Sequence, residues 1–282
     1  MDIAIRQWTE ADITIADDIQ GSAFGIPESR AAELARHLAL QPDGWFLATL
    51  GDTPVGTVGA VDYGPFAYIG LMTVRPEYQR RGIGHALMQR LLAWLDARGT
   101  PMELLDATEA GAPVYAHFGF VEEDLAYLFE HQPDTLAFDW PDGVHVLQAK
   151  DIQALCEFDT PIFGASRAAV LRALLTDFPG RAFAVHDEAG QISGYLFAQS
   201  QRIGPWAAKR RQDAQVLLRA AMSLSYQGMP LAIVPKMNEA AAELLEQFGF
   251  RFTRSCRHMR RGGSSIPSQR TLIYGQTSFA IG

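Results

Sequence analysis

Short segments from the first half of this chain recur in the same order in its second half, and this repetition constrains the fold more than any other feature. The recurring segments, each followed by its counterpart, are Ala23-Phe24-Gly25 and Ile162-Phe163-Gly164, Ser29-Arg30-Ala31-Ala32 and Ser166-Arg167-Ala168-Ala169, and Phe118-Gly119-Phe120 and Phe248-Gly249-Phe250. Similar elements in the same order indicate two copies of one fold. The 282 residues suffice for two ordinary domains. We predict these domains at residues 1–135 and 143–282, joined by a stretch rich in Pro and Asp.

The hydrophobic pattern predicts that each copy is a mixed α/β domain. The clearest helix spans residues 83–98, where Ile83, Leu87, Leu91 and Leu95 recur at helical spacing. In the first copy we expect further helices at residues 29–40 and 112–117, and strands at residues 3–6, 45–50, 55–62, 67–74 and 102–107. In the second copy we expect a helix at residues 213–227, a last helix that begins at Asn238, and a final strand at residues 270–274.

Composition excludes several classes of function. The net charge of −8 argues against nucleic acid as a partner, because phosphate binding requires a basic face. Cys156 and Cys256 have no second Cys or His at ligand spacing, so we expect free thiols and no metal site. The first residues lack the apolar core of a signal peptide, and no later run is long enough to span a bilayer. We therefore predict a cytoplasmic protein that binds neither nucleic acid nor membrane.

The segment from Leu71 to Met88 combines a buried strand, a turn that begins at Pro76, and a glycine-rich entry into the long helix. Backbone N–H groups point outward at a helix N-terminus, and the helix dipole favours negative charge there. Gly82 and Gly84 have no side chain that would keep a pyrophosphate away from the backbone. The pattern favours a phosphate site over the alternative, a plain strand–turn–helix joint with solvated arginines.

The run Gln79-Arg80-Arg81-Gly82-Ile83-Gly84 resembles the signature of the GNAT superfamily of acyl-CoA N-acyltransferases. The resemblance implies two GNAT-like domains, each with a mixed, mainly antiparallel sheet flanked by helices. It implies that amides of the loop hold the CoA pyrophosphate, and that the strand before the loop pairs with the pantetheine arm. The residues so assigned to acetyl-CoA are Met72, Thr73, Val74, Gln79, Arg80, Arg81, Gly82, Ile83, Gly84, His85 and Ala86.

Tyr115 is the candidate catalytic residue. It lies in a segment before a Gly-Phe pair that resembles the GNAT helix whose tyrosine protonates the leaving thiolate. The alternative is a tyrosine that only fills the core. No general base is visible, because the strand at residues 67–74 lacks the glutamate that many GNAT enzymes carry. The candidates nearby in sequence are Asp62, Asp106, Glu109 and His117, although residues of these types are more often surface or capping residues.

The second copy departs from this pattern. Residues 202–209 occupy the expected place of the phosphate loop, but they lack its glycine spacing, and Pro205 removes a backbone donor. Leu245 replaces the tyrosine. This half resembles the degenerate C-terminal domain of tandem GNAT proteins, which implies that only the first domain binds the coenzyme. Asp159, Arg167 and Trp206 either face the acceptor or have structural roles.

Together these features predict an N-acetyltransferase. It would transfer an acetyl group from acetyl-CoA to a primary amine, on a small molecule or a peptide, by direct attack in a ternary complex. The alternative is a non-catalytic acyl-CoA-binding sensor or regulatory protein.

Overall fold

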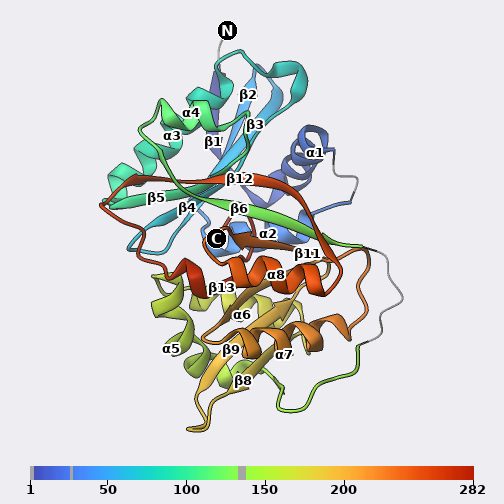
Figure 1. Cartoon of the computed structure of the whole chain (residues 1–282). Coiled ribbons are helices and arrows are strands. Elements are labelled where there is room, and N and C mark those ends of the chain that lie inside the picture. Colours follow the sequence, from blue (N-terminus) through green and yellow to red (C-terminus); the bar gives the residue numbers. More distant parts are fainter. Residues whose placement is uncertain (1–2, 26–27, 133–137) are drawn as a thin grey trace. The chain divides into compact units, whose positions relative to one another are not determined.

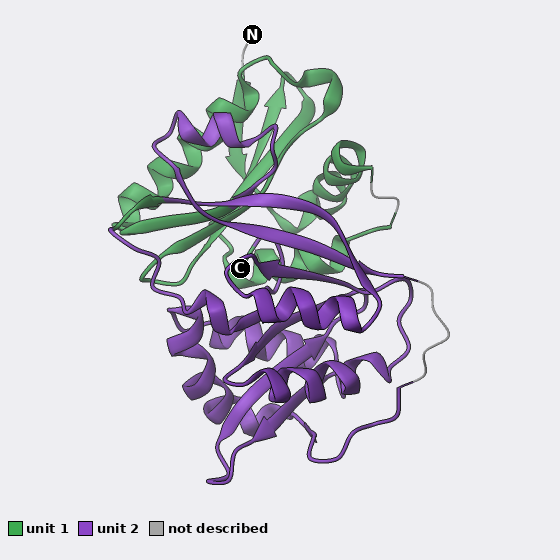
Figure 2. Cartoon of the chain, in the orientation of Figure 1, with its two compact units in different colours: residues 1–105, 261–263, 281 green, residues 106–260, 264–280, 282 purple. Residues whose placement is uncertain are grey.

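The computed structural model describes residues 3–25, 28–132 and 138–282 (Figure 1). The chain forms two compact units, coloured separately in Figure 2. Unit 1 comprises residues 1–105, 261–263 and 281, and unit 2 comprises residues 106–260, 264–280 and 282. The free thiols expected at Cys156 and Cys256 are confirmed.

Unit 1 is a five-stranded sheet with three helices. Its elements are β1 (Ile3–Gln7), α1 (Ile13–Phe24), α2 (Ala31–Leu40), β2 (Trp45–Leu50), β3 (Thr53–Asp62), β4 (Ala67–Val74), α3 (Ile83–Arg98) and β5 (Met102–Ala107). The strand order is β1-β2-β3-β4-β5, antiparallel except for the parallel pair β4–β5. The four apolar residues at helical spacing on α3 are all buried, and α3 packs on β2, β3 and β4.

Unit 2 is a larger sheet with its own helices. Its elements are α4 (Ala112–Ala116), β6 (Val121–His131), β7 (His145–Val146), α5 (Ile152–Phe163), α6 (Ala168–Asp177), β8 (Ala182–His186), β9 (Ile192–Ala198), β10 (Arg202–Ala208), α7 (Arg211–Met222), β11 (Leu231–Pro235), α8 (Glu239–Gln247), β12 (Phe250–Gly262) and β13 (Ile273–Gly275). The order is β12-β6-β11-β10-β9-β8-β7, and β13 pairs with β10. Most pairs are antiparallel, so the predicted mixed α/β class with mainly antiparallel sheets is confirmed.

β6 is the strand that departs from a simple end-to-end arrangement of two copies. It lies within the predicted first domain, residues 1–135, yet it is hydrogen-bonded to β11 and β12 of the second half. The division at residues 135 and 143 stays a prediction.

Two expectations for the second copy are wrong. Residues 202–208 are not a loop: they form strand β10, so only Lys209 and Arg210 connect this strand to α7. The helix that we expected at residues 213–227 spans Arg211–Met222 instead. Beyond its end, the Tyr226 hydroxyl and the backbone N–H of Leu224 each donate to the carbonyl of Ala221 in the last turn, at 3.1 Å.

Candidate functional site

The joint between β4 and α3 has the strand–turn–helix form that the sequence predicts. β4 ends at Val74, a short 3-10 turn covers Pro76–Tyr78, and α3 begins at Ile83. Gly82 caps the helix in the left-handed conformation with φ 81°, and no side chain caps the helix N-terminus. The first-turn N–H groups of an α-helix have no acceptor within the helix. The joint therefore presents backbone donors and the positive end of a helix dipole.

Two side chains of the loop between β4 and α3 form hydrogen bonds with carbonyls of the same connection. Gln79 Nε2 donates to the Val74 carbonyl at 3.0 Å, and Arg81 donates to the Glu77 carbonyl at 2.9 Å. Arg80 adopts a positive φ of 59°, which is uncommon for a residue other than glycine. A Cβ at Gly84 would meet only one atom within 4 Å, Val74 Cγ2 at 3.9 Å. There is open space beside the first turn of α3.

Along the second half of β4, the edge that faces β5 is not paired with β5. Parallel pairing with β5 is limited to Ala67–Ile69, whereas pairing with β3 continues to Val74. Met72, Thr73 and Val74 lie beyond the last pair with β5. Thr73 is 3% exposed, and its hydroxyl has no hydrogen-bond partner among the residues that the structure describes. An edge of this kind can accept an extended chain as an added strand.

Tyr115 belongs to unit 2, on α4. Its side chain is 8% exposed and its ring contacts that of Phe120 edge to face. A Cβ at Gly111 would lie only 3.3 Å from the Tyr115 ring, so the small residue makes room for it. Burial, and after it the nearby Cys256 side chain, raises the pKa of Tyr115 well above its usual range. The phenol is therefore protonated at neutral pH and is a weaker acid than an exposed tyrosine.

The four candidates for a general base have different surroundings. Asp62 pairs with Arg98 at 3.2 Å, and Glu109 is exposed and pairs with Arg257 at 3.1 Å. His117 is exposed, with Nδ1 2.6 Å from the Pro113 carbonyl oxygen. These three side chains have the structural partners expected of surface or capping residues.

Asp106, the fourth candidate, forms a buried pair with a histidine that sequence reasoning did not find. Asp106 Oδ1 lies 2.8 Å from His258 Nδ1, and Gln276 Nε2 donates to Asp106 Oδ2 at 2.8 Å. Burial, and after it the charge of Arg270, lowers the pKa of His258, while Asp106 opposes the change. His258 and Gln276 are each more than a hundred residues from Asp106 in sequence, so no local motif could have indicated the contact.

In unit 2, β10 and β11 correspond to β4 and β5, and a further strand, β13, lies between them. β10 and β11 pair in parallel only at Arg202 and Ile203, after which β13 pairs with β10 and also lies against β11. The backbone N–H of Gln276, just after β13, donates to the Ile233 carbonyl of β11 at 2.8 Å. Trp206 is fully buried and its ring lies 5.1 Å from that of Tyr274 on β13. β13 thus fills the opening between β10 and β11.

Asp159 and Arg167 are also buried, and they bind each other. Two nitrogens of Arg167 each lie 2.8 Å from an oxygen of Asp159. Both side chains are used inside unit 2, as is that of Trp206. These contacts favour a structural role for Asp159, Arg167 and Trp206 over contact with an acceptor.

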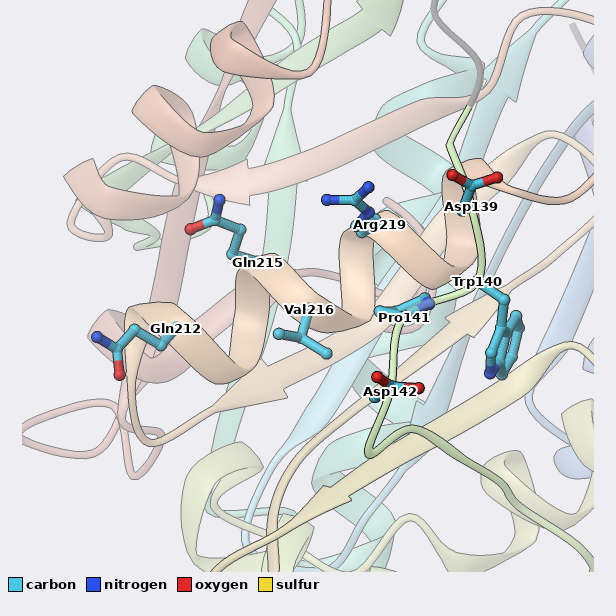
Figure 3. A pocket seen from close by; sticks show the side chains of 8 residues that line it. All are labelled: Asp139, Trp140, Pro141, Asp142, Gln212, Gln215, Val216 and Arg219. Carbon is cyan, nitrogen blue, oxygen red and sulfur yellow. The ribbon is translucent and has the colours of Figure 1, made fainter.

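A surface pocket of about 520 Å³ lies between α7 and the chain segment before β7 (Figure 3). None of the sequence-predicted site residues lines it. The residues that line it are Asp139, Trp140, Pro141, Asp142, Gln212, Gln215, Val216 and Arg219. Its two carboxylates and the exposed ring of Trp140 stand beside one guanidinium, without a pattern that indicates a ligand.

Over residues 3–25, 28–132 and 138–282, no group of three or more His, Cys, Asp or Glu side chains could hold a metal ion. Within the same ranges, no helix has both the length and the apolar character needed to cross a membrane.

Comparisons with known proteins agree with the tandem arrangement. Residues 8–120 match the model of the acetyltransferase (GNAT) family, and residues 155–275 match a second model, described as an acetyltransferase (GNAT) domain. Holothin acyltransferase of Pseudoalteromonas sp. (strain SANK 73390) is 25% identical over 224 residues, which is 76% of this chain and 74% of that protein. An uncharacterised N-acetyltransferase of Bacillus subtilis (strain 168) is 27% identical over 206 residues, 70% of each chain.

Solved structures give the same result over the whole length. A candidate acetyltransferase from Pyrococcus horikoshii superposes with a TM-score of 0.88 at 31% identity, covering 99% of this chain and 96% of its own. A GCN5-related N-acetyltransferase from Sphaerobacter thermophilus has a TM-score of 0.70 at 16% identity, with 95% and 98% of the two chains covered, and this likeness concerns the fold alone.

Proposed function

Because the chain belongs to the GNAT acetyltransferase family, with two such domains in tandem, we propose that it transfers an acetyl group from acetyl-CoA to a primary amine. The observation that carries the proposal is the joint between β4 and α3. It combines an uncapped helix N-terminus, glycines at positions 82 and 84, and an adjacent strand edge. A pyrophosphate needs backbone donors and a positive dipole, and a pantetheine arm needs a strand edge with free amides and carbonyls.

The residues assigned to the coenzyme divide into two groups. Met72, Thr73 and Val74 would pair with the pantetheine arm through their backbone. The loop and first helical turn would hold the pyrophosphate through Gln79, Arg80, Arg81, Gly82, Ile83, Gly84, His85 and Ala86. Since Gln79 and Arg81 bond to loop carbonyls, we assign their side chains to shaping the loop and the anion contacts to the backbone.

The reaction follows from thioester chemistry. The neutral amine attacks the thioester carbonyl carbon, a C–N bond forms, and the C–S bond breaks. The nitrogen loses one proton, and the departing thiolate gains one. Tyr115 is the proposed donor of the second proton, because a phenol is protonated at neutral pH and can hydrogen-bond or donate to a departing thiolate.

We assign the coenzyme to the first domain only. In the second, β13 fills the opening between β10 and β11 that corresponds to the space beside β4. The two-residue connection before α7 also lacks a glycine-rich loop. The acceptor class that we propose is a small molecule or a peptide with a primary amine.

Thermal unfolding with acetyl-CoA tests the proposal. A ligand at a hundred times its Kd stabilises the folded state by about 2.7 kcal/mol. Wild type should show this shift, and Gly84→Glu should fold but lose it, since the new carboxylate repels the pyrophosphate. Gln212→Glu is the matched control, because it adds the same charge to the first turn of α7 and should keep the shift. Absence of a shift in wild type at saturating acetyl-CoA would overturn the proposal.

A further inference from the structure

Two polar side chains from different elements of unit 1 donate to a single carbonyl of β4, and a third side chain orients one of them. Gln20 on α1 is fully buried, and its Nε2 donates to Thr57 Oγ1 at 3.0 Å and to the Leu71 carbonyl at 3.1 Å. Thr57 on β3 donates to the same carbonyl at 2.8 Å. Arg30, just before α2, donates to Gln20 Oε1 at 2.8 Å, which orients the amide. We call Gln20, Arg30 and Thr57 the polar node of unit 1.

The residue that receives these bonds has an unusual backbone. Leu71 adopts a φ of 55°, a left-handed conformation that is unfavourable for a residue other than glycine. The register between β3 and β4 shifts beside it, between Thr57 and Gly59, and the pairing of β4 with β5 has ended at Ile69. Leu71 is therefore where β4 changes direction, immediately before Met72, Thr73 and Val74.

We propose that Gln20 and Thr57 are positioning residues for the coenzyme: they hold the Leu71 carbonyl so that the backbone of Met72–Val74 meets the pantetheine arm in the correct orientation. This inference rests on the proposed function of the β4 edge. Two donors on one carbonyl offset the conformational cost at Leu71. The bend then exists before the coenzyme binds, so that binding does not have to form it.

Unit 2 contains the matching node, built from charged groups. Asp159 stands four residues before Phe163, as Gln20 stands four residues before Phe24, and Arg167 matches Arg30 in the repeated Ser-Arg-Ala-Ala segment. Tyr195 follows a glycine on β9 as Thr57 follows a glycine on β3. Arg167 binds Asp159 and the Tyr195 hydroxyl, each at 2.8 Å.

The two nodes act on different targets. In unit 1 the node bonds to the strand carbonyl beside the proposed pantetheine site. In unit 2 Arg167 donates to Thr277 Oγ1 at 3.0 Å, on the segment that follows β13. The node of unit 1 therefore holds the bend of β4 at Leu71. The node of unit 2 holds the segment after β13, the strand that fills the opening between β10 and β11.

The test compares variants that remove or keep one hydroxyl. Thr57→Val deletes the donor to Leu71 with almost no change of volume, and Thr57→Ser keeps it. Calorimetry with CoA should show about tenfold weaker binding for Thr57→Val, which loses the hydrogen bond to Leu71 and the one from Gln20, and near wild-type binding for Thr57→Ser. Gln20→Met, which removes both amide donors, should weaken binding at least as much.

Tyr195→Phe is the matched control in the second copy. It removes the corresponding hydroxyl, so it should lower Tm but leave the Kd for CoA unchanged. If wild type binds CoA and Thr57→Val binds equally well, the positioning role is wrong while the proposed function stands. If wild type does not bind CoA, the proposed function fails as well. Should Gln20→Met not fold, the comparison of Thr57→Val with Thr57→Ser decides the question alone.

Discussion

Burial shifts the pKa of two side chains, Tyr115 and His258, and in each case it favours the neutral form. Tyr115 keeps its proton because a phenolate would be poorly solvated, and His258 resists protonation because an imidazolium would be. Both residues are in unit 2, and they lead to predictions that different measurements check.

Tyr115→Phe should lower kcat for acetyl transfer by about a hundredfold or more, because the thiolate would leave without a positioned proton donor. The Kd for CoA should stay close to that of wild type. Steady-state kinetics and calorimetry on the same preparations give the two values. An unchanged kcat would remove Tyr115 from the mechanism, and the absence of turnover with any amine, despite CoA binding, would favour the sensor alternative.

His258 should make the protein less stable in acid. Its folded-state pKa is lowered, so below the ordinary histidine pKa of about 6.5 the unfolded chain binds a proton that the folded chain does not. This contribution to stability is present above that pH and is lost as the pH falls toward the folded-state pKa. Burial is the main cause of the lowered pKa, the charge of Arg270 adds to it, and Asp106 and Asp124 oppose it.

His258→Gln keeps a polar side chain at this position without the titration. Tm measured at pH 8 and at pH 5.5 should fall less on acidification in the variant than in wild type. Equal decreases in the two proteins would show that His258 does not titrate with the low pKa inferred for it.

At the scale of elements, local signals predicted local structure. The strand, turn and helix from Ala67 to Arg98 follow from an apolar run, a Pro, two glycines and helical spacing, all of which lie within one stretch of sequence. The helix α1 was not predicted, because its isoleucines, threonine and aspartates lower helix propensity and tertiary packing stabilises it instead. The contacts of Asp106 with His258, and of β13 with β10, depend on residues far apart in sequence.

β13 can lie beside β10 only because Gly204 and Gly275 lack side chains. A Cβ at Gly204 would lie 2.1 Å from the Gln276 carbonyl oxygen, so Gly204→Ala should displace the segment after β13. Gly190→Ala is the control, because its backbone also has a positive φ but its Cβ would meet no atom within 4 Å. Urea unfolding should show a loss of about 1 kcal/mol for the control and a clearly larger loss for Gly204→Ala. Equal losses would contradict the close approach of β13.

At the scale of the whole molecule, the two copies have kept one fold and have come to differ at the same place in it. Both carry a polar node between two helices and a strand, and in both the pair of parallel strands separates after a few residues. The repeat in the sequence predicted the two copies. It did not predict that β6 would pair with strands of the second half, because strand pairing over such a distance leaves no local pattern.

The difference between the copies predicts how many coenzyme molecules one chain binds. If β13 fills the second opening, calorimetry with CoA should give one site per chain. Gly84→Glu should then abolish all binding rather than half of it, because its carboxylate affects the only site. Two equivalent sites in wild type, or one site that persists in Gly84→Glu, would mean that β13 leaves its opening when CoA is present. The second domain would then have to be regarded as a coenzyme domain in its own right.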